Sequence, residues 1–539
     1  MNETCLKYAF QNLSIVDTFR LRLVSKRFNA ILLQRRIVDL SSPIASYFLL
    51  PKLSLLYNTF SSIKILKLCF HSNVDQPTLT TILDLITKIK PSTLSLINYP
   101  YHKSCPDSPL PTIMTMVPTI EFECASFLPL FSVDNLANVY SLTLILHQES
   151  PSHLKPGKQA KLLSSLHKLE FLETDCISLF NSISLKRIYS LKILSTALHC
   201  ETLHDSLSSL FNFISSSKLC ELTISSSVFS YIEHEEKATL FSMLPGSLRK
   251  LANVDLESPV AINFLENTRQ LSSLSVMGHQ SLIREFYLSG TRLNLRNLQN
   301  LSIQYLDTTE TVKLCRWSKS LNELWIDFGV ERSKFLFKLQ GKMSRNIRML
   351  VLSGFLSSPT VSCIISPLKH LETLVLDSRD SEVLGTEFFV AICNSTPKLR
   401  KIQVYQMTPA KRCEKYLKKQ AILLPFTTVV LSDCGTTRWI NVLSVSAPKV
   451  RSLLIDAVSY DSICFDTIAH FASLKLLVLQ VLHHPKSIDR LAQVWREMKP
   501  FPVLLVCPRN VTLTGGKEVL EDFAVKGPFW KHLVGLELI

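Results

Sequence analysis

Residues 321–326 read LNELWI, residues 371–376 read LETLVL and residues 474–479 read LKLLVL. In each hexad the first, fourth and sixth residues are apolar. The fourth and sixth fall on one face of a short strand, because side chains alternate with a period of two. We expect the first residue to enter the same core. A single hexad cannot bury its apolar face, so it needs similar units stacked beside it.

The hexad recurs along most of the chain. A loose apolar hexad often arises by chance when 46% of the residues are hydrophobic, so the even spacing carries the inference. The starts follow one another at about 26 residues, within the 20–29 residue range of leucine-rich repeats. Clear copies start at Leu166, Leu219, Leu271, Leu298, Leu321, Ile347, Leu371, Leu399, Val450, Leu474 and Leu533, and softer copies at Ile63, Pro91, Val117, Val139, Ile188, Leu251, Phe426 and Phe501.

The repeat predicts an α/β fold. We expect a leucine-rich-repeat solenoid that is curved, with parallel inner strands and outer helices such as Thr80–Ile89 and Pro409–Ile422. No regular Asn or Cys follows the hexads, so the array should be irregular. We assign residues 41–499 to these repeats and residues 500–539 to a terminal repeat or cap.

The segment before the array is amphipathic. Residues 6–32 read LKYAFQNLSIVDTFRLRLVSKRFNAIL, with apolar residues at helical spacing and basic residues between them. A segment this short cannot bury that much apolar surface by itself. We therefore expect residues 1–40 to form a short helical segment that docks on a partner, caps the first repeat, or does both.

The second half of this segment resembles an F-box. The stretch Val24-Ser25-Lys26-Arg27-Phe28 stands at the pattern Val-Cys-Lys-x-Trp, and Asp17 stands at the Asp that precedes it. Ala9-Phe10 stands at the pattern's Ile-Phe. The opening Leu-Pro falls on Met1-Asn2, so the first helix departs from the pattern. Followed by this array, the segment resembles F-box proteins of the leucine-rich-repeat class.

That resemblance implies a function. In this family the F-box docks on a Skp-type adaptor, and through it on a cullin, while the repeats hold a protein client for ubiquitylation. The resemblance implies adaptor-binding or F-box-core roles for Leu6, Phe10, Leu13, Leu21, Val24 and Phe28. Two alternatives stay open. One is a leucine-rich scaffold or nuclear assembly factor without a ubiquitylation role, and the other is a basic solenoid that binds nucleic acid.

A client should bind the concave face of the array. Residues at offsets two, four and six from a hexad start should point to that face. The candidate client-binding residues are Glu323, Trp325, Asp327, Lys401, Gln403 and Tyr405. A Trp and a Tyr on a polar surface are anchors of the kind that carry binding energy. Sideways packing of Trp325 against neighbouring repeats is an equally good interpretation.

Several classes of function lack sequence support. There is no Walker loop, GxSxG, HExxH or paired Cys/His set, so we expect no catalytic residues, metal ligands or cofactor. The net charge of +15 favours acidic partners, but the basic residues are dispersed along the sequence, so we do not expect nucleic acid as a partner. With no secretory signal, no membrane span and irregularly spaced Cys residues, we expect an intracellular protein of the cytoplasm or nucleus, away from membranes.

Overall fold

The computed structural model contains two compact units, Met1–Asn253 with Leu533–Ile539, and Val254–His532. The residues that the structure describes are 37–40, 63–70, 76–97, 110–124, 137–144, 163–164, 166–175, 177, 180, 187–194, 203–225, 228–229, 232–255, 259–277, 295–304, 314–315, 317–328, 346–432, 434–457, 467–468, 471–474, 476–481 and 503–506.

The first unit is built on a parallel sheet in which each strand pairs with the next along the chain. Its described helices connect successive strands. The strands are β1 (Ile37–Leu40), β2 (Ile65–Cys69), β3 (Thr93–Ile97), β4 (Thr119–Cys124), β5 (Val139–Leu144), β6 (Phe171–Thr174), β7 (Ser190–Ile193), β8 (Glu221–Ile224) and β9 (Lys250–Asp255), and the helices are α6 (Gln76–Ile89), α7 (Leu110–Met116), α9 (Leu203–Ser216) and α11 (His234–Met243).

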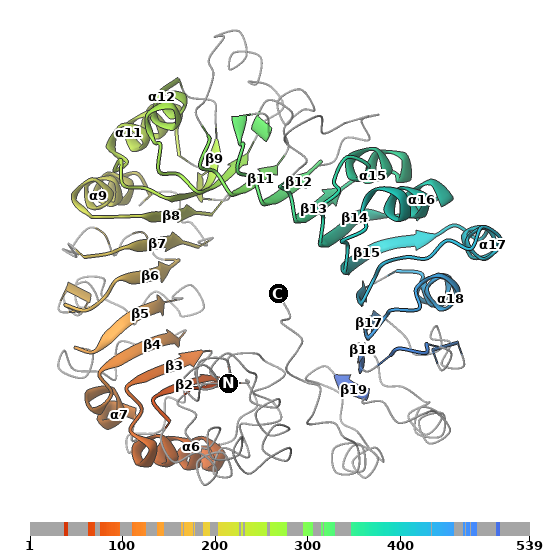
Figure 1. The fold of residues 1–539 in the computed structure, drawn as a ribbon. Coiled ribbons are helices and arrows are strands. Elements are labelled where there is room, and N and C mark those ends of the chain that lie inside the picture. Colours follow the sequence, from red (N-terminus) through yellow and green to blue (C-terminus); the bar gives the residue numbers. More distant parts are fainter. Residues whose placement is uncertain are drawn as a thin grey trace, which may run out of the picture. The chain divides into compact units, whose positions relative to one another are not determined.

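The second unit repeats this arrangement, and its helices α15 to α18 lie on one side of the strands (Figure 1). The strands are β10 (Ser273–Met277), β11 (Asn300–Gln304), β12 (Glu323–Asp327), β13 (Met349–Gly354), β14 (Thr373–Leu384), β15 (Lys401–Pro409), β16 (Thr428–Ser432), β17 (Ser452–Ala457), β18 (Leu476–Val481) and β19 (Val503–Val506), and the helices are α12 (Pro259–Asn267), α15 (Ser358–Ile365), α16 (Thr386–Ser395), α17 (Cys413–Lys419) and α18 (Thr436–Ser446).

The predicted hexads form the core. In β12 the fourth and sixth residues of the hexad, Leu324 and Ile326, are buried, and Leu321 ahead of them is buried as well. Leu324 pairs with Leu350 of β13, so leucines of successive repeats stack in register. Parallel strands one repeat apart, apolar rows facing helices and the 26-residue period together make a leucine-rich-repeat solenoid, which confirms the predicted fold class.

Three hexads were placed in the wrong register. The copy at Phe501 is one residue late, because Val503 and not Leu504 pairs with Leu477 of β18. The other two are three residues out of register. Leu172, not Leu169, pairs with Leu191 of β7, so the repeat assigned to start at Leu166 starts at Leu169. Likewise Leu251 pairs with Leu222, which moves that repeat's start to Leu248. Both three-residue errors have one cause: apolar residues at a spacing of three continue beyond the hexad, at Leu166 in the first repeat and at Val254 in the second. Sequence alone cannot tell which residue of such a series starts the repeat.

The boundary at residue 40 is also corrected. Residues 37–40 form strand β1, which pairs in parallel with β2 from Ile37 opposite Ile65 to Leu40 opposite Leu68. The sheet therefore begins inside the segment that we assigned to helices. At the other end, β19 pairs with β18, so part of the region 500–539 continues the sheet.

Aromatic side chains tie helices of the second unit to its sheet. The Trp439 indole is fully buried, and its Nε1 donates to the Met407 carbonyl at 2.8 Å. Its ring meets Phe389 edge-on, with centroids 5.7 Å apart, and Phe389 meets Phe388 at 5.0 Å. Helices α16 and α18 and strand β15 thus share one aromatic cluster.

Two Trp→Ala substitutions should distinguish a core tryptophan from a surface tryptophan by their effect on the free energy of unfolding. Trp439→Ala should lower the free energy of unfolding by about 3–5 kcal/mol, because it leaves a cavity and an unpaired carbonyl. Trp325→Ala should cost about 1 kcal/mol or less, since that side chain is 46% exposed. Urea unfolding followed by circular dichroism measures both, and equal losses would contradict this assignment of the core.

Candidate functional site

The face of the second unit's sheet that points away from its helices carries three rows of side chains. We call it the open face. Strand pairing fixes each row across β11 to β16. In chain order the first row is Asn300, Glu323, Met349, Thr373, Lys401 and Thr428, the middle row is Ser302, Trp325, Val351, Val375, Gln403 and Val430, and the third row is Gln304, Asp327, Ser353, Asp377, Tyr405 and Ser432.

The six predicted client-binding residues occupy these rows as two sets of three. Glu323, Trp325 and Asp327 lie on β12, and the other three lie on β15. Two strands separate the sets, which places them about 15 Å apart at a strand spacing of about 4.8 Å. One extended segment of a client could span both sets.

Exposure distinguishes the six residues. Glu323 and Trp325 are exposed, whereas Lys401, Tyr405 and Asp327 are half-buried. Gln403 is buried, with 6% of its surface exposed, so it offers a client little contact surface in this state. Its neighbours in the middle row, Val375 and Val430, are also buried and flank it on both sides.

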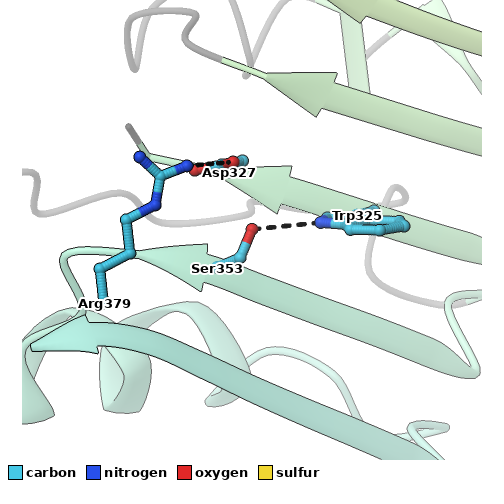
Figure 2. A network of polar contacts seen from close by, with 4 residues as sticks. All are labelled: Trp325, Asp327, Ser353 and Arg379. Carbon is cyan, nitrogen blue, oxygen red and sulfur yellow. Dashed lines mark hydrogen bonds and ion pairs between the residues drawn. The ribbon is translucent and has the colours of Figure 1, made fainter. Parts of the chain in front are cut away.

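Trp325 is held on its neighbour and yet remains accessible. Its Nε1 donates to the Ser353 hydroxyl at 3.2 Å, and 46% of the residue stays exposed (Figure 2). Ser353 pairs with Asp327, not with Trp325, so the indole leans diagonally towards the next strand. Sideways packing and client binding, the two interpretations of Trp325, are therefore compatible. The Nε1 edge of the indole is hydrogen-bonded to the neighbouring strand, and the rest of the side chain is accessible to a client.

An ion pair lies beside this indole. The Arg379 guanidinium contacts the Asp327 carboxylate at 3.1 Å, and it reaches there from β14 across strand β13 (Figure 2). The Asp327 side chain is 13% exposed and that of Arg379 is 41% exposed. Partial burial of the carboxylate strengthens the Coulombic attraction within this pair and also adds a desolvation cost, so removing one partner would leave the other partly buried and unpaired.

Asp377 adds a second carboxylate. It lies in the third row between Ser353 and Tyr405. Burial and, secondarily, the Asp327 charge raise the pKa of Asp377, and Arg379 partly opposes that shift. The Arg379 guanidinium therefore offsets charge on both carboxylates.

Sequence reasoning missed Arg379, because it lies two residues past the last hexad offset. Strand β14 is twelve residues long, and its pairing with β15 shifts between Asp377 and Glu382. With its side-chain nitrogen facing the bulge, the Gln406 amide donates to the carbonyls of Ser378 and Arg379 at 2.9 and 3.2 Å. The polar run DSRDSE at 377–382, where other repeats turn away from the sheet, is the signal that would have found it.

Other predicted features have these positions. Lys192, considered as an inward-facing cation, is paired with Glu173 at 2.5 Å. The basic run Lys411, Arg412, Lys415, Lys418 and Lys419 is exposed along and just before α17, as expected of a solvated helix face. The adaptor-binding residues Leu6, Phe10, Leu13, Leu21, Val24 and Phe28 lie outside the described residues.

Within the described ranges, no group of three or more His, Cys, Asp or Glu side chains is arranged to hold a metal ion. No helix in the described part of the chain is long and apolar enough to cross a membrane.

No protein-family model and no curated protein matches the chain. Among solved structures, the chain is similar to one in the crystal structure of the TLR13–ssRNA13 complex, with 13% identity and a TM-score of 0.34 over 83% of this chain and 58% of that one. It is also similar to one in the crystal structure of the Rad7 and Elc1 complex in yeast, with 13% identity and a TM-score of 0.36 over 75% and 96% of the two chains. These values are too low to carry a function from either protein to this chain.

The Asp377 carboxylate yields a pH prediction. Because its pKa is raised in the folded state, the charged form destabilises the fold above that pKa, and the cost disappears as the pH falls to the ordinary value of 3.8. Asp377→Asn should therefore raise the urea midpoint at pH 7 and have no effect near pH 4.

Arg379→Gln is the opposing variant. It should lower the midpoint at pH 7, because Asp327 and Asp377 lose their shared counter-charge. A gain from Asp377→Asn that persists or grows in acid would contradict this account of the carboxylates.

Proposed function

We propose that this chain is the substrate-recognition subunit of a Skp–cullin–F-box ubiquitin ligase. Its N-terminal segment docks on the Skp-type adaptor, and the open face of the second unit binds the protein client. The chain itself contributes no catalytic residues and presents the client to the ubiquitylation machinery. The accessible, oriented Trp325, on the face of the sheet opposite the described helices, is the observation that carries the client-binding half of the proposal.

The adaptor-docking half rests on the sequence. The Asp17–Phe28 stretch resembles the second part of an F-box, and its apolar residues exceed what about 30 residues can bury. Strand β1 begins at Ile37, so the repeats follow the segment within a few residues. A docking segment placed directly before a repeat array is the arrangement that a substrate receptor needs.

The client-binding half rests on the physical chemistry of the open face. Trp and Arg are enriched among the residues that dominate the energetics of protein interfaces. Both occur on this face: Trp325 lies on β12 and Arg379 lies on β14, with only strand β13 between them. The hydrogen bond from Trp325 to Ser353 fixes the indole before binding, which reduces the side-chain entropy lost on association.

The remaining polar groups add orientation. The third row places Asp327 and Asp377 where a basic group of a client would complete the neutralisation that Arg379 begins. The exposed Glu323 adds a further acid on the same strand as Trp325. Carboxylates of this kind contribute more to selectivity and association rate than to affinity.

A leucine-rich scaffold or nuclear assembly factor without a ubiquitylation role is the alternative function. It would use the same open face. The two functions differ in whether cullin accompanies the adaptor in complexes of the intact chain.

Adaptor docking is tested by co-purification. The full chain should recover both a Skp-type adaptor and a cullin, and Val24→Asp with Phe28→Asp should abolish recovery of both, because two charges would enter an apolar docking surface. The matched control is Val383→Asp with Leu423→Asp, which makes the same type of change at residues that are 48% and 60% exposed.

The control variant should retain both partners. An intact chain that recovers no adaptor would contradict the proposal, and adaptor without cullin would favour the scaffold function. Circular dichroism of each variant confirms that the repeats remain folded.

For an identified client, Trp325→Ala should raise the dissociation constant about 30-fold, which corresponds to the loss of a hot spot of about 2 kcal/mol. Val383→Ala, which also truncates an exposed apolar side chain, should change it less than about threefold. Titration calorimetry measures both, and equal effects would remove Trp325 from the client interface.

A further inference from the structure

Basic residues of the second unit gather at the edge of the sheet where its strands begin. These basic residues lie in the turn before each strand, up to the residue that immediately precedes the strand. We call this edge the start rim. All its basic residues are exposed: Arg269, Arg296, Lys319, Arg348, Lys369, Lys398, Arg400, Lys449 and Arg451.

Backbone hydrogen bonds hold the start rim in a line. The residue before each strand donates its N–H to the carbonyl of the equivalent residue one repeat earlier. For example, Arg348 bonds to Asn322 at 2.8 Å, and Arg400 bonds to Glu372 at 2.9 Å. This ladder runs unbroken from Ser272 to Arg451, about 34 Å at the spacing of parallel strands.

Side chains reinforce the same line. The amide of Asn297 donates to the Arg269 carbonyl at 2.9 Å, and that of Asn346 donates to the Lys319 carbonyl at 3.2 Å. The turns that carry the cations are thus bonded from repeat to repeat. Their spacing is set by the sheet before any partner binds.

The cations are scarcely neutralised by the chain itself. Among the described residues of the start rim Glu372 is the one acid, and Arg348 is the one basic residue in an ion pair, with Glu372 at 3.9 Å. The first row beyond the start rim contains one acid, Glu323, and one base, Lys401, which cancel. The acids Asp327 and Asp377 lie in the third row, towards the opposite end of the strands.

We propose that the start rim binds the sugar–phosphate backbone of single-stranded nucleic acid. A nucleic-acid strand carries one charge on every residue, about 3.4 Å apart along the axis when stacked and farther apart when extended. Successive turns of the start rim lie about 4.8 Å apart, and all of those from Arg269 to Arg451 except the turn before β16 carry one or two cations, which suits such a regular polyanion. The guanidinium groups also suit phosphate geometry, since they can donate two parallel hydrogen bonds.

A single strand fits better than a duplex or an acidic peptide. The start rim is one line, which follows one backbone and not the two of a duplex. Trp325 is the third residue of β12, three residues after Asn322 of the start rim. Its exposed indole can stack a base that points over the open face. An acidic peptide would need a long uninterrupted run of Asp and Glu to use the same line.

This proposal departs from the inference drawn from composition. The basic residues are dispersed along the sequence because each repeat contributes about one of them. Stacking the repeats gathers these single charges on one edge. The inference is independent of adaptor docking, which concerns the N-terminal segment.

The test is fluorescence anisotropy of a labelled single-stranded oligonucleotide of about 20 residues with the full chain, between about 50 and 200 mM salt. Arg296→Gln, Lys319→Gln and Arg400→Gln together should lower the magnitude of the salt slope by about 2. They should also weaken binding about 100-fold at 0.1 M salt, because three phosphate contacts are lost.

The matched control removes three charges from the helix side. Lys411→Gln, Lys415→Gln and Lys418→Gln should change affinity less than about threefold. A second triple in the start rim, Arg269→Gln, Lys369→Gln and Arg451→Gln, should repeat the loss, with circular dichroism to confirm folding.

Equal losses in the control and start-rim triples would overturn the proposal, as would no binding at low salt. Tighter binding of a duplex of the same sequence, or of polyglutamate, would also overturn it by assigning the line to another polyanion.

Discussion

The fold depends on the ladder of backbone hydrogen bonds that joins each strand to the strand one repeat later. The ladder forces equivalent residues into rows, such as Leu324 beside Leu350 and Trp325 beside Val351. One apolar residue per repeat therefore becomes a continuous buried row, and one exposed residue per repeat becomes a continuous surface. Parallel sheets are normally covered on both faces. Here the helices lie on one side, and on the open face Val375, Gln403 and Val430 bury one another's flanks.

The same constraint sorts charge by position in the repeat. Cations occur at the turns before the strands, and the carboxylates of Asp327 and Asp377 lie in the third row. The Arg379 guanidinium partly neutralises both carboxylates. A client bound across β12 and a polyanion along the start rim would both contact Trp325, and would otherwise contact different parts of the same strands. Substitutions of the basic residues of the start rim can thus alter polyanion binding separately from client binding.

Sequence reasoning predicted what the repeat period determines. It located most of the strands and their buried leucines, and it placed Trp325 and Asp327 on one face, because periods of 26 and of two suffice for that. It misplaced the repeats at Leu166 and Leu251, since an extra apolar residue, Leu166 in one and Val254 in the other, continues the same spacing of three. Only pairing with Leu191 and Leu222 identifies the right ones.

Sequence reasoning could not predict the contacts between repeats. The bulge that carries Arg379 to Asp327 depends on β14 extending to Leu384, and no hexad offset describes that extension. Gln403 was expected on the concave face because it lies four residues after the hexad start, but it is buried, as are the flanking valines of the neighbouring repeats. The start rim escaped notice because its charges are single residues about 26 positions apart in the sequence.

The central claim is a division of labour between the N-terminal segment and the open face. Crosslinking mass spectrometry of the complex purified with the adaptor and a bound client tests it most directly. The account predicts that adaptor crosslinks fall within residues 1–36 and that client crosslinks fall on residues of strands β12 to β15. Adaptor crosslinks on those strands, with none at the N-terminal segment, would contradict it.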